Sequence, residues 1–207
     1  MVLLSPLVHK MKVVLASSNQ GKIKEFRQLL DKLHIEIIPQ SELNVSDADE
    51  TGLSFVENAI IKARHAAQIT GLPAIADDSG LSVNALQGAP GIYSARYAGK
   101  NAQSTDNIKK LLAALHDVPD EKRDASFHCV LVFIAHADDP TPLIAHGKWQ
   151  GKILHTPMGD AGFGYDPIFY SPAEKKSAAE LAPDIKNKIS HRGQAMQTLL
   201  KLLAEKT

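Results

Sequence analysis

The 207-residue sequence has little cysteine, no excess of either charge and no long apolar run. Its single cysteine, Cys129, excludes an internal disulfide and every multi-cysteine metal motif, and its apolar surroundings predict an inert buried thiol. A formal net charge of zero argues against a broad basic surface for nucleic acid. No run approaches the roughly 20 apolar residues that cross a bilayer. We therefore expect a cytoplasmic protein that binds neither membrane nor nucleic acid.

Several catalytic signatures are also absent. The nine histidines show no zinc-like spacing and form no H-E-x-x-H motif. No G-x-S-x-G nucleophile elbow occurs, and no G-x-G-x-x-G fingerprint follows the first strand. These absences argue against a zinc peptidase, a serine hydrolase of the elbow type and a dinucleotide-dependent oxidoreductase.

The segments that are present alternate between apolar and amphipathic, which predicts an α/β domain. Residues 1–10 are expected to be an N-terminal extension, either disordered or a non-native start, and residues 11–207 a single domain. The pattern predicts strands over 12–16, 34–38, 72–76, 81–86, 125–136 and 142–154. It predicts helices over 23–33, 54–70, 104–115 and 190–204, with Ser54 and Ser104 as N-caps.

The first candidate site is the polar loop that joins the first strand to the first helix. It reads Ser17-Ser18-Asn19-Gln20-Gly21-Lys22, with small hydroxyls, a flexible glycine and a cation. A helix N-terminus presents unpaired N–H groups, so anions bind there. The loop is not a Walker A motif, because G-x-x-x-x-G-K-[ST] is absent. A simple capped turn between strand and helix is the alternative interpretation.

Acidic side chains provide the second candidate. Asp77 and Asp78 follow an apolar strand, and because neighbouring strand residues point to opposite faces, only one of them need face a cleft. Mg²⁺ takes one or two carboxylates together with phosphate oxygens, so a second acid such as Glu50 would complete a site. Lys62 lies in the helix that follows. The alternatives are a hydrogen-bonded turn, a solvated acidic loop and a surface lysine.

Two further segments suit recognition of a purine base. In the run from Gly162 to Pro167, glycines flank Phe163 and allow close approach, while the rings of Phe163 and Tyr165 offer stacking faces. Lys186 and the run Ser190-His191-Arg192-Gly193 offer donors to a 6-oxo group, whereas the 6-amino group of adenine would place donor against donor. A β-bulge filled by core aromatics and a helix cap with surface charges are the alternatives.

Each of these motifs is common on its own, but their occurrence together in this order is specific to one family. The motifs are Ser17–Lys22, Glu50–Gly52, Phe55–Ala59, Ala76–Leu81, Gly88–Tyr97, Phe163–Pro167 and Ser190–Gly193. Together, from Met11 to about Leu203, they resemble the inosine/xanthosine triphosphate pyrophosphatase family, which hydrolyses non-standard purine nucleoside triphosphates. Two departures are the Ser17-Ser18 pair, where family members often carry Thr-Gly, and residues 1–10, which match nothing in the family.

The resemblance implies a fold and an activity. The fold is a long, curved, mixed β-sheet with flanking helices that form two lobes around a central cleft, in a homodimer. The activity is Mg²⁺-dependent cleavage of ITP, dITP and XTP to the nucleoside monophosphate and pyrophosphate, which keeps deaminated purines out of DNA and RNA. A non-catalytic nucleotide-binding module and a related pyrophosphatase for modified pyrimidine nucleotides remain as alternatives.

The resemblance also implies roles for individual residues. Asp78 would be the general base and a metal ligand, Glu50 the second metal ligand, Lys62 a contact to phosphate or water, and Lys22 a catalytic phosphate contact. Arg96 lies in a matching motif without an assigned role. The residues implied in substrate binding are Ser17, Ser18, Asn19, Gln20, Gly21, Lys22, Ser79, Phe163, Gly164, Tyr165, Asp166, Lys186, His191 and Arg192.

Overall fold

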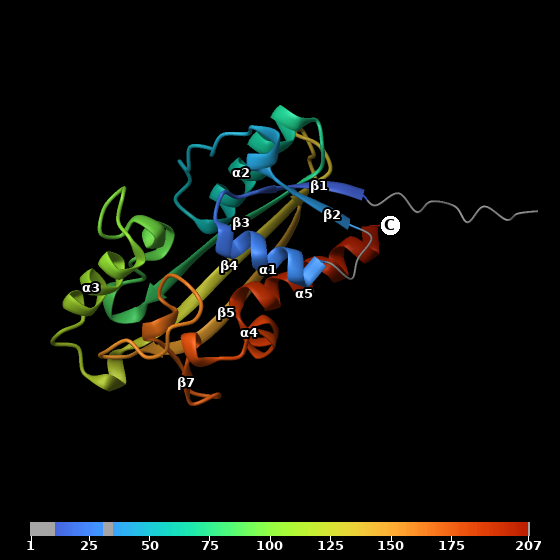
Figure 1. Cartoon of the computed structure of the whole chain (residues 1–207). Helices are drawn as coiled ribbons and strands as arrows, with labels where there is room; N and C mark the ends of the chain where they lie inside the picture. The colour runs from blue at the N-terminus through green and yellow to red at the C-terminus, as the bar shows by residue number, and fades with distance from the viewer. Residues whose placement is uncertain (1–10, 31–34, 207) are drawn as a thin grey trace, which may run out of the picture.

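A single seven-stranded sheet runs through the molecule in the order β2-β1-β3-β4-β5-β6-β7 (Figure 1). The structure is a computed structural model that describes residues 11–30 and 35–206, so the expected N-terminal extension lies outside the described residues. β1 pairs in parallel with β2 and β3, and the remaining neighbours pair antiparallel. The predicted mixed sheet of an α/β fold is confirmed, and its division into two lobes stays a prediction.

The elements have the following bounds. The strands are β1 (Met11–Ala16), β2 (Ile35–Pro39), β3 (Ala74–Val83), β4 (Asp124–Ile134), β5 (Leu143–Ile153), β6 (Phe169–Ser171) and β7 (Lys176–Ser177). The α-helices are α1 (Gln20–Leu30), α2 (Phe55–Thr70), α3 (Ser104–Ala114), α4 (Pro183–Ile189) and α5 (His191–Lys206). The short 3-10 helices are η1 (Gln40–Leu43), η2 (Asn84–Leu86), η3 (Gly91–Arg96), η4 (Asp120–Lys122), η5 (Asp166–Ile168) and η6 (Ala178–Glu180).

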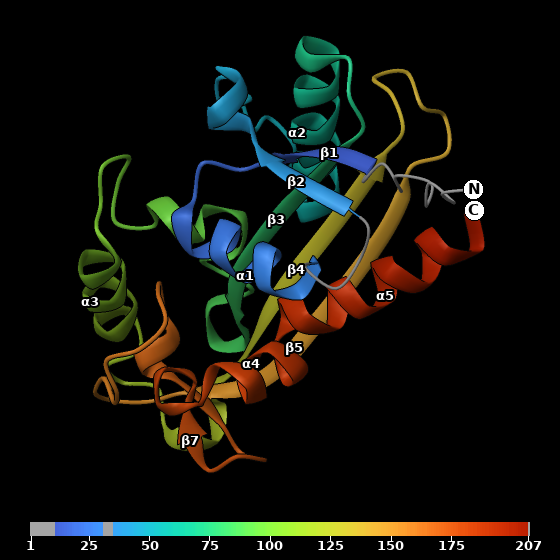
Figure 2. The ribbon, with the colours of Figure 1, turned by 45° about the vertical axis from the view of Figure 1, so that its right-hand side comes forward.

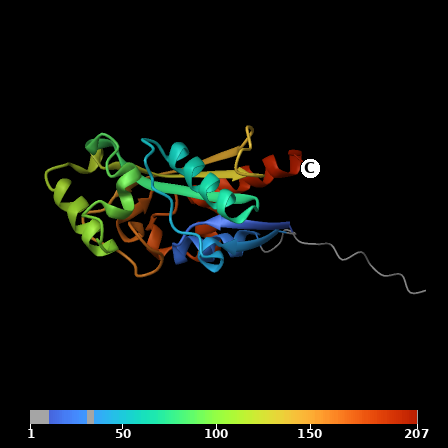
Figure 3. The ribbon, with the colours of Figure 1, turned by 90° about the horizontal axis from the view of Figure 1, so that it is seen from above.

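Helices cover both faces of the sheet because its central strands are apolar on both sides. In β1, Val13 and Leu15 join a core cluster with residues of α1 and α5, whereas Val14 and Ala16 join one with the alanines of α2. Figure 2 shows α5, in red, running across β4 and β5. A third cluster surrounds Trp149 at the end of the molecule that carries α3, opposite the C-terminus in Figure 3. None of the described helices is long and apolar enough to span a membrane.

The structure corrects three expectations about local structure. β3 is one strand from Ala74 to Val83, not two strands separated by a loop at residues 77–80. It stays continuous because β4 pairs with all of it, and because Gly80 lets η3 approach: a β-carbon there would lie 2.3 Å from the carbonyl oxygen of Gly91. Ser104 is the first residue of α3 and not its cap, since Gln103 precedes the helix and donates its N–H to the Asp106 carboxylate at 3.0 Å.

The third correction is α4, a seven-residue helix that was not predicted because its two apolar residues, Ile185 and Ile189, are too few to show a helical period. The start of α2 agrees with expectation, because the side chain of Ser54 accepts a hydrogen bond from the N–H of Glu57. At the other end of α2, Gly71 ends the helix with a φ of 68°.

Candidate active site

The loop between β1 and α1 is held in a tight turn by its own side chains. Ser17 Oγ accepts a hydrogen bond from the N–H of Asn19 at 3.2 Å, and Asn19 Oδ1 accepts one from the N–H of Lys22 at 3.1 Å. The first turn of α1 is thereby fixed where an anion is favoured. Gly21 lies against the ring of Phe163, since a β-carbon at Gly21 would come within 2.9 Å of it. The predicted phosphate loop therefore lies beside the predicted base platform.

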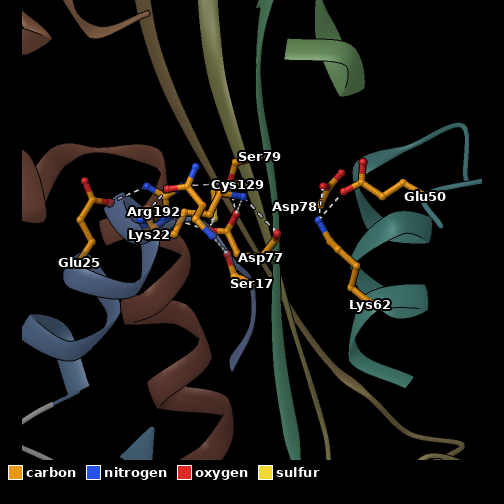
Figure 4. A network of polar contacts seen from close by, with 11 residues as sticks. Ser17, Lys22, Glu25, Glu50, Lys62, Asp77, Asp78, Ser79, Cys129 and Arg192 are labelled. Carbon is orange, nitrogen blue, oxygen red and sulfur yellow. Dashed lines mark hydrogen bonds and ion pairs between the residues drawn. The ribbon is translucent and has the colours of Figure 1, made fainter. Parts of the chain in front are cut away.

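Asp77, near the middle of β3, is the centre of a buried ion-pair network (Figure 4). Its Oδ1 accepts hydrogen bonds from Lys22 Nζ at 2.5 Å and Ser79 Oγ at 2.6 Å, and its Oδ2 accepts one from Arg192 Nε at 2.6 Å. Desolvation raises the pKa of Asp77, but the charges of Arg192 and Lys22 outweigh it and hold the pKa well below its ordinary value. The network ties α1, β3 and α5 together.

Asp78 points to the opposite side of β3, toward α2, as strand alternation requires (Figure 4). Its Oδ1 accepts a hydrogen bond from Lys62 Nζ at 2.6 Å, whereas its buried Oδ2 has no hydrogen-bond partner among the described residues. Lys62 also donates to Glu50 Oε1 at 2.9 Å, and Arg96 Nη1 donates to Glu50 Oε2 at 2.9 Å.

The two carboxylates on Lys62 differ in basicity. Burial raises the pKa of Asp78, and the charge of Lys62 opposes this without reversing it. Burial also acts to raise the pKa of Glu50, but Lys62 and Arg96 together hold that pKa below its ordinary value. Asp78 is therefore the better proton acceptor of the pair.

Phe163 and two cations form the base side of the site. Phe163 is 36% exposed, and Lys186 Nζ lies 5.3 Å and the guanidinium carbon of Arg192 5.8 Å from the centre of its ring. Asp166 Oδ2 accepts hydrogen bonds from the N–H of Phe163 at 2.8 Å and from Lys186 Nζ at 2.6 Å. Burial raises the pKa of Asp166 although Lys186 opposes it. Asp166 thus fixes the loop that presents a ring on which a base can stack.

Two other predicted base-side residues are buried. Tyr165 donates its hydroxyl to the carbonyl oxygen of Ser94 at 2.9 Å and belongs to the core, so its ring is less available for stacking than that of Phe163. His191 stacks on Phe127 with ring centres 4.7 Å apart, and its Nδ1 has no partner among the described residues. Burial holds the pKa of His191 well below its ordinary value, so the ring is neutral and can either donate or accept.

One cleft of about 640 Å³ brings these groups together, a volume that suits a small-molecule ligand. Three predicted residues are not in its lining: Gln20 and Gly21, which form the first turn of α1, and Asp78, which is hydrogen-bonded to the lining residue Lys62. The predicted residues that line the cleft are Ser17, Ser18, Asn19, Lys22, Glu50, Lys62, Ser79, Phe163, Gly164, Tyr165, Asp166, Lys186, His191 and Arg192.

Each lysine and arginine in the described lining already has a carboxylate partner. The pairs are Lys22–Asp77, Lys62–Glu50, Lys62–Asp78, Arg96–Glu50, Lys186–Asp166, Lys186–Glu25, Arg192–Asp77 and Arg192–Glu25. A polyanionic ligand would therefore meet cations whose charge is already balanced. Asp78 and Glu50, which share Lys62, could hold a divalent cation that supplies the missing charge. In residues 11–30 and 35–206, no group of three His, Cys, Asp or Glu could hold a metal.

Three residues of the site have roles that the sequence analysis did not assign. Asp77 appeared only as the neighbour of Asp78, and Arg96 had no role, yet they hold Lys22 and Glu50 in place. Glu25 was not considered at all. Its spacing of three from Lys22 puts both on one face of α1, which is the one signal in the sequence that could have identified it.

Comparisons with known proteins find similar sequences over nearly the whole chain. Residues 13–202 match the model of the Ham1 family. A dITP/XTP pyrophosphatase of Vibrio cholerae is 61% identical over 194 residues, which cover 94% of this chain and 97% of that protein. A protein of the same name from Escherichia coli O157:H7 is 60% identical over 192 residues, which cover 93% of this chain and 98% of that protein.

Solved structures extend the likeness to the fold. A HAM1 protein from Coxiella burnetii superposes with a TM-score of 0.88 at 56% identity, covering 94% of this chain and 99% of that one. A nucleoside-triphosphatase, or dITP/XTP pyrophosphatase, from Mycobacterium abscessus gives a TM-score of 0.74 at 40% identity, with 92% and 99% covered. Because the Ham1 family model matches residues 13–202, and relatives of about 60% identity cover nearly the whole chain, the chain belongs to the Ham1 family.

Proposed function

We propose that the chain hydrolyses non-standard purine nucleoside triphosphates, namely dITP, ITP and XTP, to the nucleoside monophosphate and pyrophosphate. The observation that carries the proposal is one cleft lined both by the first turn of α1 with Lys22 and by the base side around Phe163. Relatives named dITP/XTP pyrophosphatase match over nearly the whole chain. The activity would remove deaminated purines before a polymerase incorporates them.

A bound triphosphate would need an added cation, because each lysine and arginine of the described cleft lining is already paired with a carboxylate. Asp78 and Glu50 each direct one carboxylate oxygen to the same point, the ammonium of Lys62, so together they offer two hard oxygen donors of the kind that Mg²⁺ prefers. We assign Asp78 and Glu50 as the ligands of a magnesium ion. When bound, it would neutralise charge that develops on the phosphate oxygens.

The protein's own groups position the reacting water and the phosphates. Lys62 fixes Oδ1 of Asp78 at 2.6 Å and leaves Oδ2 to orient the attacking water and accept its proton. Burial raises the pKa of Asp78, which favours this transfer near neutral pH. Lys22 and the N–H groups of the α1 terminus stabilise the triphosphate from a fixed position, because Asp77 holds the Lys22 ammonium.

The pocket would select its base because the wrong base leaves polar groups of the protein without hydrogen-bond partners. A hypoxanthine or xanthine ring stacked on Phe163 presents its 6-oxo acceptor to donors from His191 and Arg192, whereas adenine presents a 6-amino donor. Ser79 and Asp166 would contact the nucleoside, and Lys186 would lie beside the ring. We further propose that residues 11–207 act as one domain within a homodimer that works in the cytoplasm.

The test is a panel of nucleoside triphosphates with and without Mg²⁺, with pyrophosphate release as the readout. ITP, dITP and XTP should be hydrolysed far faster than ATP, and omission of Mg²⁺ should abolish release. A preference for a modified pyrimidine triphosphate would reassign the substrate. Binding of ITP without pyrophosphate release in the presence of Mg²⁺ would refute the enzymatic proposal.

A further inference from the structure

Asp47 lies in the acidic loop (residues 44–54) between η1 and α2 and is hydrogen-bonded to side chains beside the predicted phosphate loop. Its Oδ1 accepts a hydrogen bond from Ser18 Oγ at 2.7 Å and another from Gln40 Nε2 at 2.5 Å. Gln40 Nε2 also donates to Ser18 Oγ at 3.1 Å. All three residues line the cleft. Together they join the loop after β1 and the start of η1 to the loop that carries Glu50.

The donors that hold Asp47 are neutral groups on well-placed side chains. Gln40 is 3% exposed, so the surrounding protein holds its amide group in one direction. Ser18 lies at the turn into α1, where the sequence departs from the family pattern, and a glycine at this position would have no hydroxyl to donate. A phosphate oxygen accepts hydrogen bonds from hydroxyl and amide groups as a carboxylate oxygen does. Asp47 therefore occupies two donors that also suit a phosphate group.

Asp47 differs from other acids of the cleft in what balances its charge. Glu50, Asp77 and Asp166 each contact a lysine or an arginine. In the part of the chain that the structure describes, Asp47 forms no ion pair and its carboxylate is held by the two neutral donors. A polyanion in the cleft would therefore meet a carboxylate that occupies its donors and also repels it. Because Asp47 is exposed, solvent weakens the repulsion, and the occupied donors are the larger obstacle.

We propose that the Asp47 carboxylate takes the place of a phosphate group while the cleft is empty. The outer phosphates of a triphosphate, and afterwards the pyrophosphate product, bind by displacing it from Ser18 and Gln40. The inference rests on the proposed function. Asp47 thereby lowers the affinity for pyrophosphate and speeds its release. Since it weakens substrate and product alike, it limits product inhibition without changing how the transition state is stabilised.

The test is calorimetric titration of inorganic pyrophosphate, with and without Mg²⁺, and of inosine monophosphate as a separate ligand. The main variant is Asp47→Ala, which removes the carboxylate and frees Ser18 and Gln40. The matched control is Asp49→Ala, because Asp49 lies in the same acidic loop, lines the same cleft and carries the same charge. Among the described residues, no hydrogen bond joins the Asp49 carboxylate to either donor.

Asp47→Ala should bind pyrophosphate about fivefold more tightly than the wild type, because two donors become free and each hydrogen bond can change affinity several-fold. Asp49→Ala removes the same charge without freeing a donor, so its gain should stay within about twofold. Inosine monophosphate should bind all three proteins with similar affinity, because its single phosphate adjoins the nucleoside. In a Ser18→Ala background the gain from Asp47→Ala should shrink, since one of the freed donors is gone.

An Asp47→Ala protein whose affinity for pyrophosphate is unchanged or lower, or is matched by that of Asp49→Ala, overturns the inference. If Asp47→Ala does not fold, Asp47→Asn keeps the shape of the side chain and should give a smaller gain in the same direction, and no gain there overturns the inference as well. The titrations require no turnover. A wild-type protein that binds pyrophosphate but releases none from ITP removes the proposed function, while the affinities still decide the role of Asp47.

Discussion

The substitution Asp77→Asn tests whether the buried ion-pair network holds the fold and the site together. Asp77 is 1% exposed and neutralises Lys22 at 2.5 Å and Arg192 at 2.6 Å. In the variant, an amide N–H₂ would face one of these donors, and the two cations would lose their shared counter-charge. Breaking a buried ion pair from one side costs about 3–5 kcal/mol. At roughly 2–4 °C per kcal/mol for a domain of this size, Tm should fall by about 6–20 °C.

The assays are thermal denaturation, which gives Tm, and urea denaturation, which gives the free energy of unfolding, both followed by the fluorescence of Trp149, the single and buried tryptophan. Asp117→Asn is the control, since Asp117 is fully solvated beside His116 and its loss should change little.

The pKa of Asp77 is depressed in the folded protein, so Asp77 stabilises the fold fully above its unfolded pKa. This stabilisation is lost as pH falls from about 4 through the folded pKa. Asp77→Asn should therefore weaken the acid dependence of stability. A loss below about 1 kcal/mol with an unchanged acid profile would refute the reasoning.

Three further predictions concern the reaction and the scaffold. Asp78→Asn should lower kcat by at least about 100-fold with the circular dichroism spectrum retained, and near-normal turnover would remove Asp78 from the mechanism. Because burial raises the pKa of Asp78, the acid limb of kcat/KM for the wild type should lie above the ordinary value of 3.8, and a profile that stays flat down to that pH would contradict the assignment. Gly147→Ala would put a β-carbon 1.9 Å from the carbonyl oxygen of His191, so the free energy of unfolding in urea should drop by about 3 kcal/mol or more. A change smaller than about 1 kcal/mol there would show that α5 can shift freely.

Much of the fold follows from local patterns in the sequence. The hydrophobic pattern alone located four elements close to their observed bounds: β1, α2, β4 and β5. The ends of α2 were also marked in the sequence, by Ser54 and Gly71. β3 was misjudged because Asp77, Asp78 and Gly80 look like the start of a loop. They remain in a strand because cations from three helices neutralise the carboxylates, and no local pattern shows those contacts.

The site could be predicted only as far as its residues form short motifs. Lys22, Phe163 and Arg192 are far apart in the chain, yet each lies in a recognisable run, and the cleft contains all three. Glu25 and the clamp of Arg96 on Glu50 were missed because their roles arise from packing between α1 and α5 and between η3 and the acidic loop. Such pairings depend on the assembled sheet: the spacing of Glu25 from Lys22 puts both on one face of α1, but nothing in the local sequence shows that Arg192 is the partner.

The opposite orientation of Asp77 and Asp78 on β3 gives two identical amino acids separate duties. Asp77 is held as an anion between Lys22 and Arg192, whereas Asp78 has an oxygen without a partner among the described residues, which the proposed mechanism uses to accept a proton. A slip of one position along this strand would exchange those duties and disable both. Insertions or deletions between Ala76 and Gly80 should therefore abolish the activity even where the chain still folds.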